Sequence, residues 1–83
     1  MESLVPFYFF DVHDGGYQRD EEGTYCTDLE SAALAARRLL PAIAANETVI
    51  QEDRKIITVL VTDEEGRAVY SAALSLVGTW LIR

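Results

Sequence analysis

Four segments of the chain show the alternating or continuous apolar pattern that is typical of β-strands. They span residues 7–13, 17–26, 55–62 and 67–77. The second segment is interrupted by Asp20-Glu21-Glu22-Gly23, so we expect that strand to be short or bulged. Asp14-Gly15-Gly16 and Asp63-Glu64-Glu65-Gly66 carry the glycines and aspartates that tight turns favour. The pattern therefore predicts two hairpins.

One helix is predicted between the hairpins. Apolar residues recur at positions 29, 33, 36, 40 and 43, the spacing of a helix that lies on a sheet. Thr27 begins a capping-box pattern that closes at Glu30, and Asp28 is the alternative cap residue. Pro41 removes an amide donor, so the helix either kinks or restarts there, and it should stop near Asn46.

The order β-β-α-β-β predicts an α+β fold, a two-layer sandwich in which one helix covers one face of a mainly antiparallel four-stranded sheet. We expect residues 1–83 to form a single domain, with a lead-in at 1–6 and an extension at 78–83. Phe7 and Phe9 point to one face, and Tyr8, Phe10 and Val12 to the other, so both faces of the first strand are apolar.

One helix cannot cover both of these faces, so the pattern predicts self-association through the open sheet face or a sheet edge. A homodimer is the simplest product. The residues that we expect at this interface are Tyr8, Phe10, Leu60, Ala73, Trp80 and Leu81.

Charge and cysteine content narrow the functional classes. Fourteen Asp and Glu against seven Lys and Arg give a net charge of −7, which argues against direct binding of nucleic acid. A single cysteine, Cys26, excludes an internal disulfide. The N-terminus lacks the pattern of a secretory signal, and the longest uncharged run, Ala68 to Ile82, is too short and too polar to span a membrane. We therefore expect a cytoplasmic protein with no membrane partner.

Asp11, His13 and Asp14 form the one cluster that resembles metal or acid–base chemistry, and Asp20 or Glu21 could supply a further ligand. The favoured interpretation is structural: Asp14 caps the turn, Asp11 accepts a hydrogen bond from a neighbouring backbone amide or an arginine, and His13 ends the strand. The sequence accordingly predicts no catalytic residue, no metal and no cofactor.

Asp-Glu-Glu-Gly occurs twice, at residues 20–23 and 63–66. Paired calcium-binding loops are one interpretation, but neither copy has the twelve-residue ligand spacing of an EF-hand. Solvated hairpin turns are the favoured interpretation, and they would gather negative potential at the two tips.

Four runs carry a resemblance to a known family: Tyr8–Gly15, Asp20–Thr24, Asp28–Glu30 and Val59–Arg67. They resemble a family of short bacterial proteins classed as domain of unknown function 6894. The resemblance covers nearly the whole chain and implies a small cytoplasmic bacterial protein, with no activity, cofactor or catalytic residue to carry over. A second similarity, through Asp14–Tyr17 and Thr27–Ala32, is to the antitoxin half of HicAB-type pairs. It covers less of the chain and includes no DNA-binding segment.

Three functional hypotheses follow. The first is a non-catalytic interaction module that self-associates. The second is an acidic inhibitor or antitoxin-like protein that occupies a basic site on a nucleic-acid-acting partner. The third is a metal-binding sensor or enzyme that uses Asp11, His13 and Asp14.

Overall fold

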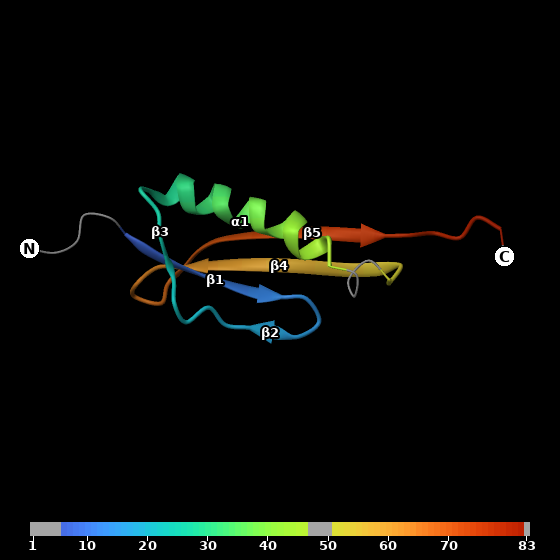
Figure 1. Cartoon of the computed structure of the whole chain (residues 1–83), viewed down its shortest axis with the longest axis horizontal. Helices are drawn as coiled ribbons and strands as arrows, with labels where there is room; N and C mark the ends of the chain where they lie inside the picture. Colours follow the sequence, from blue (N-terminus) through green and yellow to red (C-terminus); the bar gives the residue numbers. More distant parts are fainter. Residues whose placement is uncertain (1–5, 47–50, 83) are drawn as a thin grey trace, which may run out of the picture.

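The computed structural model describes residues 6–46 and 51–82 and consists of one helix packed on an antiparallel sheet (Figure 1). The elements are β1 (Phe7–His13), β2 (Tyr17–Gln18), β3 (Thr24–Tyr25), α1 (Leu29–Ala44), β4 (Arg54–Thr62) and β5 (Ala68–Val77). The sheet order is β2-β1-β4-β5, and β3 also pairs with β1. The predicted α+β class is therefore confirmed. The sheet has five strands where four were expected, because the second strand is divided.

The division of the second strand lies at Asp20–Gly23. Both β2 and β3 pair antiparallel with the same edge of β1, with Tyr17 opposite His13 and Tyr25 opposite Phe7. Between the two pairings, residues 19–23 face residues 9–11 of β1, so the outer chain carries extra residues and bulges. The first Asp-Glu-Glu-Gly copy is therefore not a hairpin tip, contrary to the prediction. The second copy joins β4 to β5 as predicted, with Gly66 at φ +81°.

The hydrophobic core lies between α1 and one face of the sheet. Helix α1 lies over β4 and β5 and contributes alanines, whose small side chains allow close approach. The buried apolar residues are Tyr8, Val12, Cys26, Ala32, Ala33, Ala36, Leu40, Ile57, Val59 and Val61. Because side chains alternate between the faces of a strand, Phe9 and Leu60 point to the opposite face, which no element covers within the described residues.

Asp28, not Thr27, caps the helix. Its carboxylate accepts a hydrogen bond from the Ser31 amide at 2.8 Å, while the Thr27 hydroxyl lies 3.0 Å from the Ser31 hydroxyl. That backbone bond is the main reason that the pKa of Asp28 is lowered. The helix continues through Pro41 to Ala44 as one element, because Pro41 lies in the last turn and only one backbone hydrogen bond is lost.

Strand β5 forms one edge of the sheet, and a bulge marks its beginning. Val61 pairs with Tyr70 and Thr62 pairs with Ala68, so Val69 is the extra residue. Beyond Val77 the pairing continues for one bond, since the Gly78 amide donates to the Asp53 carbonyl at 2.6 Å. The chain then continues away from the sheet toward the C-terminus (Figure 1).

The predicted terminal segments are described in part. Of the lead-in 1–6, only Pro6 lies within the described residues, and the extension 78–83 is described up to Ile82. The described part of the chain contains no helix of the length and apolarity needed to cross a membrane.

Candidate functional site

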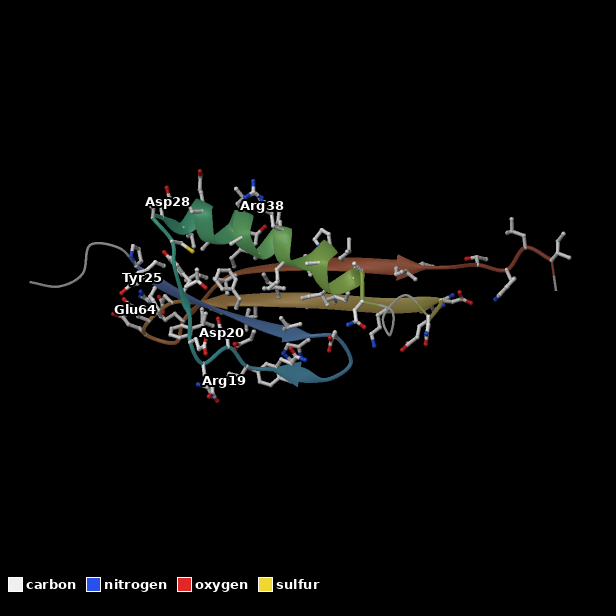
Figure 2. The ribbon with its side chains drawn as sticks, viewed as in Figure 1. Arg19, Asp20, Tyr25, Asp28, Arg38 and Glu64 are labelled. Atoms are coloured by element: carbon white, nitrogen blue, oxygen red, sulfur yellow. The ribbon has the colours of Figure 1, made fainter. Side chains whose placement is uncertain are left out.

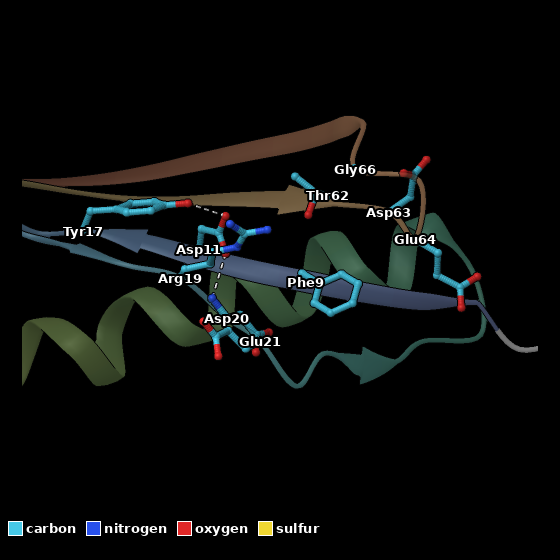
Figure 3. A pocket seen from close by; sticks show the side chains of 10 residues that line it. All are labelled: Phe9, Asp11, Tyr17, Arg19, Asp20, Glu21, Thr62, Asp63, Glu64 and Gly66. Atoms are coloured by element: carbon cyan, nitrogen blue, oxygen red, sulfur yellow. Dashed lines mark hydrogen bonds between the residues drawn. The ribbon is translucent and has the colours of Figure 1, made fainter.

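An acidic hollow of about 670 Å³ lies on the uncovered face of the sheet (Figure 3). Its floor is formed by Phe9 of β1 and Thr62 of β4, which pair directly. Residues of both Asp-Glu-Glu-Gly segments surround it, so the sheet register brings together two copies that are far apart in sequence. The lining residues are Phe9, Asp11, Tyr17, Arg19, Asp20, Glu21, Thr62, Asp63, Glu64 and Gly66. Five carboxylates and one guanidinium thus line it.

Asp11 is the most buried charged side chain of the hollow, at 7% exposure. One carboxylate oxygen accepts the Tyr17 hydroxyl at 2.8 Å, and the other accepts the Asp20 amide at 2.9 Å (Figure 3). The hydrogen bond to Asp11 raises the pKa of Tyr17, because loss of the phenolic proton would place two negative oxygens together. Asp11 therefore fixes the segment after β2 against β1.

Asp20 takes the place of the missing strand neighbour of β1. Its Oδ2 accepts the Phe10 amide at 3.0 Å, and its Oδ1 accepts the amides of Glu22 and Gly23 at 3.0 and 3.1 Å. Partial burial by itself would raise the pKa of Asp20, but these three amides, from Gly23, Phe10 and Glu22, outweigh it and lower the pKa. Figure 2 shows Asp20 on the segment that links β2 to β3.

Asp63 performs the corresponding task in the β4–β5 turn. Its Oδ1 accepts the amides of Glu65 and Arg67, each at 2.9 Å, and its Oδ2 accepts Arg67 Nε at 2.8 Å. The Arg67 amide is the largest cause of the lowered pKa of Asp63. In both copies of the motif, then, the leading aspartate organises a turn and the two glutamates are exposed to solvent.

The structure separates the three residues of the predicted metal cluster. Asp11 is occupied by its two donors, while Asp14 accepts the Gly16 amide at 3.4 Å across the hairpin turn. His13 is exposed, and its ring lies against Tyr17 with centroids 4.5 Å apart. Within residues 6–46 and 51–82, no group of three or more His, Cys, Asp or Glu side chains could hold a metal ion. Asp11 and Asp14 thus make the structural bonds that the favoured interpretation assigned to them.

The predicted interface residues fall on different surfaces. Tyr8 is buried in the core, at 8% exposure, and Phe10 packs against that core, so neither forms part of the uncovered face. The prediction combines residues from the two faces of the sheet, because the sequence leaves open which face the helix covers. Leu60 and Ala73 do lie on the uncovered face, since they pair with Asp11 and Thr58, respectively.

Trp80 and Leu81, the other predicted interface residues, lie in the C-terminal extension and are 65% and 90% exposed. The Trp80 indole donates to Asp53 Oδ2 at 3.0 Å, which fixes the beginning of the extension against the start of β4. An apolar segment therefore extends beyond the end of the sheet in a defined direction.

Sequence analysis missed the hollow and its floor. Phe9 and Thr62 are more than fifty positions apart, and only the pairing of β1 with β4 makes them neighbours. The repeated Asp-Glu-Glu-Gly is the available signal, although the sequence alone favours two separate hairpin tips. The hollow offers carboxylates beside the aromatic rings of Phe9 and Tyr17, a combination that attracts a cationic side chain.

Comparison with protein-family models matches residues 7–75 to a domain of unknown function (DUF6894). Neither a curated protein nor a solved structure matches the chain.

Proposed function

Because the chain belongs to the DUF6894 family, which supplies no activity to carry over, we propose from its structure that it is a non-catalytic protein–protein interaction module that self-associates. The observation that carries the proposal is the β5 edge of the sheet. Strand β5 is ten residues long and contains neither a charged residue nor a proline. Its outer side has no strand neighbour within the described residues.

An edge of this kind is expected to be covered by a partner. Half of the backbone amides and carbonyls of an edge strand point outward, and natural proteins discourage strand addition there with charges, prolines or bulges. The described sheet uses such devices on its other edge, where β2 and β3 are two residues each and the link between them is charged. On β5 the only such device is the bulge at Val69, near the start.

A second copy is the partner that the charge distribution favours. Two chains of net charge −7 repel each other unless they meet where carboxylates are absent. The run from Ala68 to Ile82 contains no charged residue, and it includes all of β5 and the described extension. A strongly basic partner would instead be drawn to the acidic side of the molecule.

The non-catalytic part of the proposal is supported by the side chains of the hollow. Asp11 and Asp20 are both held by structural hydrogen bonds. The one histidine of the chain, His13, does not line the hollow. No described lining residue is a nucleophile activated by a neighbouring base.

A cytoplasmic location is a further part of the proposal. Cys26 is a free, buried thiol. Burial is the main reason that its pKa is raised, and the negative charge of the nearby Asp28 carboxylate is the second reason. A thiol in that state is a weak nucleophile that packs as a small apolar group. This suits a reducing compartment, in which disulfides are rare.

Sedimentation equilibrium from micromolar to submillimolar concentration tests the self-association. We expect a species heavier than the 9.3 kDa chain, in a concentration-dependent equilibrium. Ser75→Lys places a charge on exposed β5, and we expect it to raise the dissociation constant by about tenfold or more.

The matched control is Ile56→Lys, which places the same charge on the residue that pairs with Ser75, on the same face but one strand further in. We expect this variant to associate like the wild type. A wild-type chain that stays monomeric throughout would refute self-association. Loss of association in Ile56→Lys alone would move the interface from the edge to the open face.

The acidic hollow supports a second candidate function, that of an acidic protein which docks on a basic site of a nucleic-acid-acting partner. Glu21 and Glu64 reach the hollow from its two sides, and both are exposed. Carboxylates gathered in a concave surface focus negative potential and speed the association of a basic partner. In this candidate the hollow receives a lysine or arginine side chain of that partner.

Titration calorimetry with an arginine-rich peptide tests this candidate. We expect binding at low ionic strength that weakens as salt is added, and that weakens further in Glu21→Gln/Glu64→Gln. Glu30→Gln/Glu52→Gln, which removes two charges from exposed residues that do not line the hollow, is the control for net charge. Equal binding by both variants would show that the peptide responds to overall charge, and the hollow would have no specific role.

A further inference from the structure

We infer that two copies of the chain join through antiparallel pairing of their β5 strands, about a two-fold axis that passes through Leu74. This inference rests on the proposed self-association and specifies its geometry. The regular part of β5 begins at Tyr70, directly after the bulge, and backbone pairing ends at Gly78, which bonds to Asp53. Leu74 is the middle residue of that run.

The two-fold axis fixes the pairs on each face. With Leu74 opposite its own copy, Ala73 lies opposite the second copy's Ser75. Both of these side chains are small and lie on the uncovered face, so they leave that face flat across the junction. Paired residues of antiparallel strands share a face, so both helices lie on the same side of the joined sheet.

Exposed leucines on the helix side support this arrangement. Leu74 is 38% exposed although it faces the helix layer, and Leu34 of α1 is 40% exposed. Leu34 lies one turn before Arg37, whose Nη1 donates to the Tyr70 hydroxyl at 3.0 Å, so this side of α1 faces β5. In the dimer Leu74 contacts its own copy across the axis, whereas Leu34 lies toward the Tyr70 end of β5, the end that faces the other chain's extension.

The same pairing places the extension after β5 beside the second copy. Trp80 and Leu81 follow Gly78, which lies opposite Tyr70 of the second copy. The extension of each chain therefore runs past the beginning of the other chain's β5, where Ala68 and Val69 also lack charge. The whole uncharged run is thus used in one interface, while the acidic hollows of both copies stay on the open face.

Cysteine cross-linking tests the register. We expect an equimolar mixture of Ala73→Cys and Ser75→Cys to form a covalent dimer under mild oxidation, since directly paired residues have Cα atoms about 5 Å apart. Each variant alone should cross-link poorly, because residues 73 and 75 are one position from the axis, so each lies diagonally from its own copy, about 8 Å away. A mixture of Ser71→Cys and Ala73→Cys is the matched control, and the wild type controls for Cys26, which is buried.

Hydrogen exchange of the backbone amides separates edge pairing from other dimers. We expect the alternate β5 amides that point away from β4 to gain protection as the concentration is raised into the dimeric range. Two sheets that stack face to face lie about 10 Å apart, so such a dimer would give neither the disulfide nor this protection.

The outcomes are separable. Efficient cross-linking of Ala73→Cys alone, or of Ser75→Cys alone, would refute the axis at Leu74. A dimer without cross-links or new amide protection would refute edge pairing and leave self-association standing. A monomer would refute the proposed function itself.

Discussion

Replacement of Asp20 by asparagine tests whether one carboxylate substitutes for the missing middle of the second strand. Both oxygens of Asp20 accept backbone amides, Oδ2 from Phe10 and Oδ1 from Glu22 and Gly23. Asparagine has a single acceptor oxygen, so its amide group must face one of these donors. Hydrogen bonds to a charged acceptor contribute about 1.5–3 kcal/mol each, and Asp20 is only partly buried, so we expect a loss of about 2 kcal/mol in the free energy of unfolding.

The effect of Asp20→Asn should depend on pH in a defined direction. The pKa of Asp20 is lower in the folded chain than its ordinary value of 3.8. Its contribution to stability is therefore complete above that ordinary value and is lost as the pH falls through the lower, folded value. The stabilities of wild type and variant should differ most near neutral pH and converge in acid.

Urea unfolding followed by far-ultraviolet circular dichroism, at one protein concentration, measures this difference from about pH 7 to about pH 3. For a domain of this size, 2 kcal/mol also lowers the midpoint of thermal unfolding by roughly 8–16 °C. Glu21→Gln is the control, because it removes a charge from the exposed neighbour and should change stability by less than about 0.5 kcal/mol. A loss that is the same at both pH values, or absent at neutral pH, would refute the role assigned to Asp20.

Three further predictions concern the helix cap, the glycines and the buried carboxylate. Asp28→Ala should destabilise the chain by about 1 kcal/mol in urea unfolding, whereas Thr27→Ala should cost clearly less; the reverse order would return the cap to Thr27. Gly23→Ala should be more destabilising than Gly66→Ala: both sites have positive φ, but only the methyl group at residue 23 would clash with aromatic rings, those of Phe7 and Phe9. Equal losses of stability in the two variants would contradict this. An alkaline titration followed by absorbance, in which the curve of Tyr17→Phe is subtracted from that of the wild type, isolates the Tyr17 phenol. We expect this phenol to ionise above its ordinary pKa of 10.0. Ionisation at or below that value would contradict the hydrogen bond to the buried Asp11 carboxylate.

Much of the fold could be predicted because side-chain alternation is a local property. The two faces of β1, the small open face of β5 and the turn at Gly66 all follow from residues that are close in sequence. The choice of cap did not follow, since Thr27 and Asp28 are adjacent and both can accept from a helix amide. Only the backbone conformation of Asp28, extended at φ −158°, decides between them.

The site was harder to predict because it depends on register. The two Asp-Glu-Glu-Gly copies have the same letters, but one closes a hairpin between long strands and the other bulges beside β1. The flanking segments decide this: the chain around the first copy pairs over only two residues at a time. The sequence also leaves open which face of the sheet the helix covers, and so it groups Tyr8 with Leu60 although the two side chains point to opposite faces.

The interruption of the second strand also sets a limit on assembly. A sheet whose two edges both accept strands can add copies without end and form a fibre. Here the β1 side of the sheet ends in two short strands separated by a bulge in which Asp20 already bonds the Phe10 amide. In the proposed dimer the two β5 edges pair with each other, so each outer edge of the joined sheet would be one of these interrupted edges. The same aspartate that bonds the Phe10 amide in the monomer would then limit the assembly to two copies.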